Sequence, residues 1–331
     1  MNELAVAAFA AETGSHVLSE PRSARFAKFV RAFDEAAYLV AIKTLGVRWL
    51  PRSAASFPRG LASIFDPPVG LFVRGAGDVM LLERPAVAIV GARSCSPYGS
   101  SVARMLGREL AGAGLVVVSG LARGVDGEAH RGALEAGGTT IAVLGCGAER
   151  VYPAAHGELA RRVADNGLIV SEYAPGVEPA PWRFPARNRI IAGLAAATVV
   201  VEARERSGAL ITADLALEEG REVFAVPGEI TSALSTGTNA LLRIGATALT
   251  SSTDVLEAFG IAAAPAASVH LSTTAERVLV QLRDRPAAVD ELTRELTVPA
   301  SDIATALAEL ELAALVAEHA GVYRATGARS A

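Results

Sequence analysis

Short apolar runs rich in β-branched residues recur through the middle of the chain and alternate with helical stretches. Seven such runs lie at residues 87–91, 115–120, 140–145, 168–172, 197–203, 222–228 and 246–250. Because these runs are apolar throughout instead of alternating with polar residues, they predict strands buried on both faces. The stretches between them place apolar residues at i, i+3 and i+4 and end at glycine. This order predicts an α/β fold with a doubly wound, mostly parallel sheet.

The segments that flank this region predict smaller units. Residues 22–45 predict helices, and residues 70–75 (GLFVRG) predict a strand that could join the edge of the sheet. Toward the C-terminus, helices are expected near residues 274–283, 288–296 and 301–312, followed by two short strands around His319, Ala320 and Gly321. Three helices and a hairpin describe a winged helix.

Proline-rich and alanine-rich stretches suggest the domain boundaries. Pro67, Pro68 and Pro85 precede the predicted sheet, and AAAPAAS at residues 262–268 follows it as a short linker. We therefore expect an N-terminal helical region at 1–56, the sheet domain at 57–260, a linker at 261–268 and a winged-helix domain at 269–331.

The composition predicts a large globular protein and restricts where an anion could bind. The 331 residues are 51% hydrophobic with a mean hydropathy of +0.35, which is enough for a large core. Charged residues make up 20% and the net charge is −4, which excludes a disordered acidic chain and a basic protein that coats nucleic acid. Any anion site must therefore be local. Lys28 and Lys43 are the only lysines, so P-loop and Schiff-base chemistry beyond residue 43 is excluded.

Cysteine usage and the start of the chain predict a cytoplasmic protein. Cys95 and Cys146 are too few for a disulfide scaffold or a four-thiolate zinc site. The opening residues, MNELAVAAFAAETGSH, lack the basic region of a signal peptide. The longest apolar run, residues 190–201, is too short to cross a bilayer.

Small residues follow nearly every predicted strand, at the edge of the sheet where ligands bind in open α/β folds. The first such turn, GARSCSPYG at residues 91–99, is not the G-x-G-x-x-G of a dinucleotide site, and no acidic residue follows Ser119 and Gly120 to bind a ribose. A dehydrogenase is therefore not expected. The turn does offer Gly91, Arg93 and Ser96 before a helix, the composition of a phosphate cradle. Alternatively, Arg93 caps the end of another helix.

The next two turns repeat this composition and extend the expected site into a trough. SGLARGVDGEAH (119–130) adds Arg123, and GCGAERVYP (145–153) adds Arg150 and Tyr152. Asp126 is expected to cap the helix that follows, and a catalytic pair of Asp126 with His130 is the alternative.

Cys95 and Cys146 fall on neighbouring turns of this trough. We interpret them as small buried residues, and a redox pair is the alternative.

Two arginines and an amide stand at the start of a helix that is otherwise apolar. Arg187, Asn188 and Arg189 precede the run IIAGLAAA, and such a group at a helix N-terminus is suited to gripping phosphates. Internal salt bridges to Glu172 or Glu202 are the alternative. Glu202 and Glu229 are the candidates for acid–base chemistry at this edge, and each could equally orient arginines.

Six motifs together resemble a known family. They are FPARNRIIAGL, VVEARERSGALITADLALEEGREVFAVPG, SGLARGVDGEAH, GCGAERVYP, SEYAPG and STGTNALLRIGA. With them, about residues 57–260 closely resemble the DprA/Smf family, the DNA-processing proteins of natural transformation. The resemblance implies a Rossmann-like domain that binds single-stranded DNA cooperatively as a homodimer. It also implies a recombination mediator that loads a RecA-type recombinase and displaces single-strand-binding protein, with no catalytic residue, cofactor or metal.

The resemblance also implies which residues bind the DNA backbone. The matching motif positions are Gly91, Arg93, Ser96, Ser119, Gly120, Arg187, Asn188, Arg189, Ser207 and Gly208, to which Arg150 adds a charge and Tyr152 a base-stacking face.

The flanking segments depart from the family pattern. Residues 1–56 lack the hairpin of G-V-G type found in the helical domain of many members, so we do not expect DNA binding at this end. The predicted recognition helix, ASDIATALAELELA (300–313), has no Lys or Arg and carries Asp302, Glu309 and Glu311. Because these carboxylates would face phosphates in a DNA groove, we expect the winged helix to bind protein.

Two other functions stay open from the sequence. A nucleotide hydrolase related to the cytokinin-activating phosphoribohydrolases would share a glycine-rich, Glu-bearing sheet edge. Their P-G-G-x-G-T loop is not reproduced by the SGAL of residues 207–210 or the PGE of residues 227–229. The other is a scaffold that docks partners through the winged helix without binding DNA.

Overall fold

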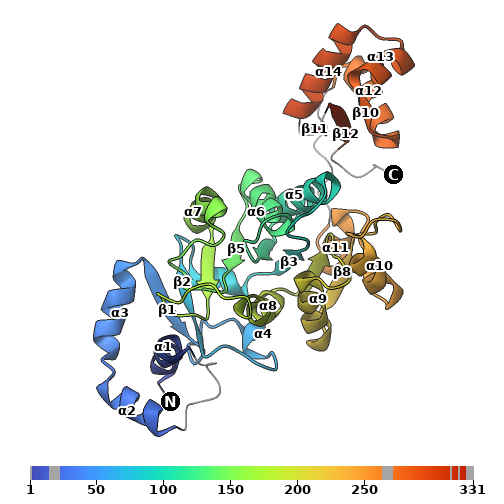
Figure 1. Cartoon of the computed structure of the whole chain (residues 1–331). Helices are drawn as coiled ribbons and strands as arrows, with labels where there is room; N and C mark the ends of the chain where they lie inside the picture. The colour runs from blue at the N-terminus through green and yellow to red at the C-terminus, as the bar shows by residue number, and fades with distance from the viewer. Residues whose placement is uncertain (1, 15–22, 263–270, 314, 320, 326–331) are drawn as a thin grey trace. The chain divides into compact units, whose positions relative to one another are not determined.

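The chain divides into two compact units, Met1–Ile261 and Ala262–Ala331 (Figure 1). The structure, a computed structural model, describes residues 2–14, 23–262, 271–313, 315–319 and 321–325. Most of the linker expected at 261–268, and Ala320 in the expected turn of the wing, lie outside the described residues.

A nine-stranded sheet forms the centre of the first unit. The strands are β1 (Val47–Pro51), β2 (Gly70–Arg74), β3 (Ala86–Val90), β4 (Val116–Ser119), β5 (Thr140–Val143), β6 (Leu168–Ser171), β7 (Ala197–Val200), β8 (Glu222–Ala225) and β9 (Thr247–Ala248). Their order is β1-β2-β6-β5-β4-β3-β7-β8-β9, and all neighbours from β6 to β9 are parallel. The seven predicted strands and the doubly wound topology are confirmed.

The strand predicted from GLFVRG is also confirmed, but it is not the edge of the sheet. β2 pairs antiparallel with β6, and β1 pairs antiparallel with β2 from Val47↔Arg74 to Pro51↔Gly70. β1 was not predicted; its five residues include an exposed Arg48 and end in a proline. β1 is therefore the outer strand of the sheet at this side.

The direction of the chain across the sheet reverses at β3. From β3 the chain moves through β4, β5 and β6 to one side, and it then returns to the other side of β3 with β7, β8 and β9. In open α/β sheets, ligands bind in the crevice outside the carboxyl ends of the strands at this switch point. The fold therefore places a ligand site between the segments that follow β3 and β7.

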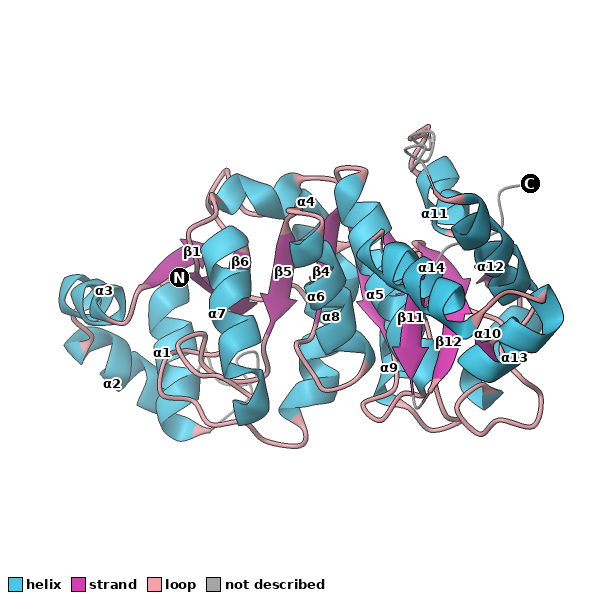
Figure 2. Ribbon diagram, turned by 90° about the horizontal axis from the view of Figure 1, so that it is seen from above, coloured by secondary structure: helices cyan, strands magenta, loops and turns pink. Residues whose placement is uncertain are grey.

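Helices cover both faces of the sheet (Figure 2). One face packs against α5 (Pro97–Gly112), α6 (Val125–Glu135), α7 (Gly157–Asn166) and α11 (Ser252–Ala258), and the other against α4 (Arg59–Ala62), α8 (Arg183–Leu194), α9 (Gly208–Glu218) and α10 (Thr236–Arg243). Two 3₁₀ helices, η1 (Val79–Glu83) and η2 (Ala154–His156), complete the connections.

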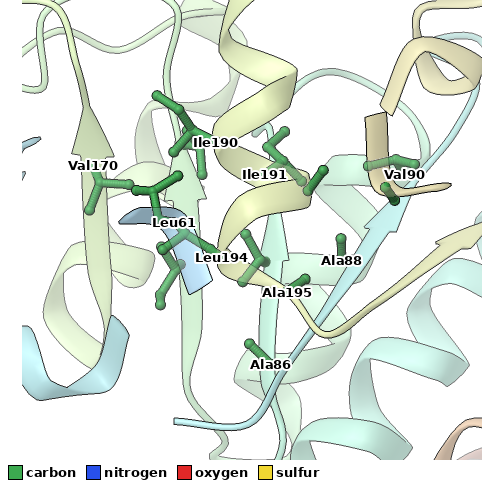
Figure 3. Packing of buried hydrophobic residues seen from close by; sticks show 14 of the residues in the cluster. Leu61, Ala86, Ala88, Val90, Val170, Ile190, Ile191, Leu194 and Ala195 are labelled. Carbon is green, nitrogen blue, oxygen red and sulfur yellow. The ribbon is translucent and has the colours of Figure 1, made fainter. Parts of the chain in front are cut away.

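Residues of β3 alternate between these two faces, as the pleat of a strand requires. Val87 and Ile89 pack with the α5 and α6 side, whereas the small Ala86 and Ala88 point to the α8 side. Figure 3 shows Ile190, Ile191 and Leu194 of α8 packed beside these alanines. The apolar run after Arg189 is therefore the face that fixes α8 to the sheet.

The N-terminal segment contributes three helices, α1 (Glu3–Thr13), α2 (Ala24–Ala32) and α3 (Glu35–Thr44). The helices predicted within residues 22–45 are confirmed, whereas α1 was not predicted. Leu4, Val6 and Phe9 of α1 are buried in one cluster with Phe72 of β2. The start of the chain therefore packs on the sheet.

The second unit is a winged helix, as predicted. It contains α12 (Thr273–Asp284), β10 (Ala287–Ala288), α13 (Val289–Leu296), α14 (Ala300–Leu312), β11 (Val316–His319) and β12 (Val322–Ala325), with strand order β10-β12-β11. The Glu309 carboxylate of α14 accepts hydrogen bonds from the backbone N–H and the hydroxyl of Ser272, at 2.7 and 2.6 Å. One acid of the would-be recognition helix therefore anchors the start of α12.

In neither unit is any described helix both long enough and apolar enough to cross a bilayer.

A buried histidine links α6 to β5. The hydroxyl of Thr140 donates to the Val117 carbonyl at 2.8 Å, so its oxygen must accept from Nδ1 of His130 at 2.7 Å. Nε2 of His130 is then an unprotonated nitrogen, and it has no partner among the described residues. Burial lowers the pKa of His130 to about 3, and repulsion from His156 adds to the shift.

We expect the free energy of unfolding to fall as the pH falls below 6.5. The unfolded chain takes up a proton near pH 6.5 that the folded His130 takes up only near pH 3, so the stability due to the neutral ring is lost between these values. Between these pH values the unfolding free energy should fall by about 1.4 kcal/mol per pH unit. Urea denaturation of the wild type and of His130→Asn at about pH 7, 6 and 5 measures this pH dependence. These pH values lie above the range in which most carboxylates titrate. Equal slopes in the two proteins would contradict the assignment.

Candidate nucleic-acid interface

Two adjoining cavities open at the carboxyl ends of the parallel strands. The switch-point cavity, of about 470 Å³, is lined by residues that follow β3 and β7 and by the start of α8 and α9. The side cavity, of about 510 Å³, is lined by residues that follow β4 and β5. Arg93, Ser94, Ala122, Phe184 and Arg187 line both. The predicted trough is thus one continuous site in the place expected from the topology.

Glu202 fixes the loop that carries Arg93. Its buried carboxylate accepts hydrogen bonds from the backbone N–H of Ser96 at 2.8 Å and from the Ser96 hydroxyl at 2.5 Å. The same hydroxyl accepts from the Gly99 N–H at 3.0 Å and caps α5. Ser96, predicted to bind phosphate, is therefore committed to the helix and to Glu202. Since both Glu202 oxygens are bound in this way, Glu202 orients the Arg93 loop and is not available as an acid–base group.

Asp126 organises the loop between β4 and α6. Its Oδ2 accepts from the backbone N–H groups of Gly120 and Ala122 at 3.1 and 3.3 Å. The prediction that Asp126 caps the following helix is wrong, because Gly124 is the N-cap and Asp126 lies inside α6. In the same loop Leu121 has a φ of +57°, a left-handed conformation that a bulky residue rarely adopts. Its carbonyl lies 3.0 Å from Nδ1 of the buried His156.

Asp126 and His130 do not form the catalytic pair that the sequence left open. The hydrogen-bond partner of His130 is Thr140, whereas Asp126 holds the loop N–H groups.

Arg187 forms the floor between the two cavities. Its side chain is 4% exposed, and its Nη1 donates to the Gly120 carbonyl at 2.9 Å and also to the Val143 carbonyl. Burial lowers the pKa of Arg187 to about 10; the attraction of Asp126 opposes this shift, and repulsion from Arg93 adds to it. Burial likewise raises the pKa of Asp126. Arg187 therefore binds the ends of β4 and β5 together from below the site.

Arg189 points away from both cavities. Its Nη1 and Nη2 donate to the two oxygens of Glu172 at 2.8 and 2.7 Å, and its Nε donates to Asp66 at 2.9 Å. The alternative of an internal salt bridge to Glu172 is confirmed, and Arg189 lines neither cavity, which argues against the predicted role as a phosphate ligand. The pKa of Arg189 is raised by these two carboxylates despite the opposing effect of burial.

Two further predicted residues also lie outside the cavity linings. The hydroxyl of Ser119 is buried and donates to the Ile89 carbonyl at 2.6 Å. Arg150 pairs with Glu178 at 2.9 Å and donates to the Gly176 carbonyl at 3.3 Å. Both groups therefore bind the protein itself.

The structure brings eight predicted residues together around the cavities: Gly91, Arg93, Gly120, Tyr152, Arg187, Asn188, Ser207 and Gly208. Asn188 donates to the Gly208 carbonyl at 3.0 Å, which holds α8 against the start of α9. A Cβ atom added to Gly208 would meet nothing within 4 Å, so this helix N-terminus is open to a ligand. Phosphate binding by these residues stays a prediction.

Four arginines at the mouth of the cavities have no carboxylate or hydrogen-bond partner among the described residues. Arg93 follows β3, Arg123 follows β4, and Arg204 and Arg206 follow β7; all four side chains are exposed. Within the described parts of the chain, none of their guanidinium groups forms an ion pair or a hydrogen bond. The predicted site did not include Arg204 and Arg206, although they stand directly after β7 in the motif VEARERSG.

An aromatic stack lines the side cavity. The rings of Tyr152 and Phe184 stack at a centroid distance of 5.3 Å and an angle of 20°, and Cζ of Arg93 lies 5.1 Å from the centre of Phe184. Tyr152 is 43% exposed, so one end of the stack is open to solvent. The predicted site missed Phe184, for which the signal is an aromatic residue in the first turn of the helix that carries Arg187.

The two cysteines pack in different clusters on the sheet. Cys146 is buried with the α7 side and lines the side cavity, whereas Cys95 packs against the α5 and α6 side. Both are free thiols, and burial raises the pKa of Cys146 to about 11. Cys146 agrees with the interpretation as a small buried residue, whereas Cys95 is half-buried, and the packing of the two thiols in separate clusters does not favour a redox pair.

Comparison with known proteins agrees with the resemblance inferred from the motifs. Residues 48–260 match the family model described as DNA recombination-mediator protein A, and residues 262–322 match the DprA winged helix domain. The chain is 48% identical over 203 residues to the DNA processing protein DprA of Streptococcus pneumoniae, over 61% of this chain and 71% of that protein. It is 38% identical over 286 residues to Protein Smf of Escherichia coli, over 83% of this chain and 76% of that protein.

Solved structures of similar proteins share this fold. DNA processing protein A of Streptococcus pneumoniae aligns with a TM-score of 0.66 at 40% identity, over 77% of this chain and 91% of that one. DNA processing protein A of Helicobacter pylori, whose structure is described as showing a single-stranded DNA binding mode, aligns with a TM-score of 0.56 at 34% identity, over 61% and 92%. Since one family model spans more than half of the chain, the chain belongs to the DNA recombination-mediator protein A family, also called DprA/Smf.

Proposed function

We propose that the chain binds single-stranded DNA at the two cavities and passes it to a RecA-type recombinase. The observation that carries this proposal is the group of four unpaired arginines, Arg93, Arg123, Arg204 and Arg206, at the mouth of the site. The planar guanidinium group of arginine can donate two parallel hydrogen bonds to phosphate oxygens. A groove lined by such cations binds a nucleic-acid backbone without sequence preference. The single-stranded DNA binding described for the Helicobacter pylori relative supports the same chemistry here.

The aromatic stack supports binding of single-stranded DNA in particular. The open face of Tyr152, backed by Phe184, offers a surface on which an unpaired base can stack. In a duplex the faces of the bases are covered by their neighbours, so this surface favours a strand whose bases are free.

Chemistry on the DNA is not part of the proposal. The family descriptions name processing and recombination mediation, without a catalytic activity. Glu202 is bound by Ser96, and Glu229 is exposed and does not line either cavity. A nucleotide hydrolase that used either glutamate as its acid–base group would need that carboxylate at the reacting atom.

Partner binding completes the proposed role. As a recombination mediator the chain would act as a homodimer that displaces single-strand-binding protein and loads the recombinase. A strand-exchange assay on DNA precoated with single-strand-binding protein tests this role, because the chain should restore exchange by a RecA-type recombinase. Light scattering of the full chain tests the dimer.

The exposed arginines should set the salt dependence of DNA binding. We expect Arg93→Ala and Arg206→Ala each to lower the slope of log K against log salt by about 0.7, since each removes one phosphate contact to a single strand. Fluorescence anisotropy of labelled poly-dT across a salt series measures the slope. Arg84→Ala is the matched control, because Arg84 is exposed and precedes β3 at the opposite end of the strand. Unchanged slopes in both cavity variants would place the DNA elsewhere.

Arg189→Ala should change stability and leave the salt slope as it is. The substitution leaves the buried carboxylate of Glu172 without its cationic partner, which costs about 3 to 5 kcal/mol of unfolding free energy. Urea denaturation measures this loss, and the same anisotropy series run below the unfolding midpoint measures the slope. A stable variant with a reduced slope of log K against log salt would show instead that Arg189 contacts the DNA.

A further inference from the structure

We propose that Trp182, together with Arg183 and Tyr173, forms a second base-stacking surface outside the cavities, which extends the path of the bound strand. This inference rests on the proposed binding of single-stranded DNA. Trp182 and Tyr173 line neither cavity, and the site residues inferred from the motifs do not include them.

The Trp182 ring is held in place and still open to solvent. Cζ of Arg183 lies 4.9 Å from the centre of the Trp182 ring and 5.3 Å from that of Tyr173, and the two rings meet edge to face at 6.4 Å and 85°. Arg183 is itself fixed, because its Nη1 donates to the Glu178 carbonyl. Trp182 nevertheless remains 46% exposed. Since Arg183 covers one face of the ring, the exposed surface belongs to the other face and the edges.

The position of Trp182 places this surface beside the proposed DNA path. Trp182 is the N-cap of α8, and Phe184, two residues later, lines both cavities and stacks on Tyr152. Two aromatic rings, each in contact with an arginine, therefore stand at the start of α8. A DNA strand that leaves the cavity over this part of the helix would contact the Trp182 ring next.

The chemistry of this surface suits any nucleobase. An exposed indole offers a large flat apolar face, and a nearby guanidinium adds attraction for the π system and for the phosphate that follows. Each stacked base is worth about 1 to 3 kcal/mol by alanine substitution, without sequence preference.

The chain has two tryptophans, which makes the inference directly measurable. Trp49 lies on the outer strand β1, packed on Phe72 at 4.6 Å and separated from β3 by four strands, or about 24 Å. We expect titration with poly-dT to quench the tryptophan fluorescence of the wild type and of Trp49→Phe. Trp182→Phe should still bind in anisotropy, because phenylalanine also stacks, but the quench should be lost.

Affinity provides a second readout. We expect Trp182→Ala to weaken binding of poly-dT of about 20 nucleotides by about fivefold or more, with the salt slope unchanged, since stacking releases no counterions. Phe65→Ala is the matched control. Phe65 is 98% exposed, and its N–H donates to Glu219 at the far end of α9 from Gly208, about 16 Å from the cavity.

The outcomes separate the inference from the proposed function. Wild-type binding in anisotropy without a tryptophan quench, or a Trp182→Ala variant with wild-type affinity, would overturn the stacking surface while leaving the cavity intact. Absence of wild-type binding in anisotropy would overturn the proposed function itself.

Discussion

One buried guanidinium holds the geometry of the site. Arg187 donates to carbonyl groups at the ends of β4 and β5, and Asp126, which attracts it, gathers the N–H groups of the β4–α6 loop. A charge buried this deeply is costly unless carbonyl dipoles and an opposite charge surround it, and here they do. A Cβ atom on Gly120 would lie 2.5 Å from Nη2 of Arg187, so that position requires glycine. The loops above therefore depend on the position of this single group.

The arginines of the site form two groups, those that bind a carboxylate or carbonyl group of the protein and those that do not. Arg187 and Arg189 lie within α8 and donate hydrogen bonds to protein groups below the surface. Arg93, Arg123 and Arg206 extend from loops after the strands, where no carboxylate of the described residues forms an ion pair with them. A buried layer of paired charge thus supports an outer layer of unpaired charge. The buried layer keeps the loops fixed, so little ordering has to occur when an anion binds.

The fold could be predicted from the sequence far better than the site. Continuous apolar runs mark strands covered on both faces, so the parallel sheet was evident, whereas β1 is interrupted by the exposed Arg48 and ends in a proline. The site region was also evident, because small residues follow each strand. The role of each arginine was not, since Arg189 and Arg206 differ only in whether Glu172 or open solvent lies nearby. That difference arises from residues distant in sequence, which no local motif records.

The mouth of the site is assembled from both halves of the doubly wound sheet. Arg93 belongs to the half that begins at β3, and Arg206 to the half added after the chain crosses back to β7. During synthesis Arg93 emerges more than a hundred residues before Arg206. A nascent chain that ends before residue 206 thus presents only part of the positive rim. An anionic strand that bridged both halves would gain its full set of contacts only from the completely folded sheet. Its binding would therefore stabilise that state alone.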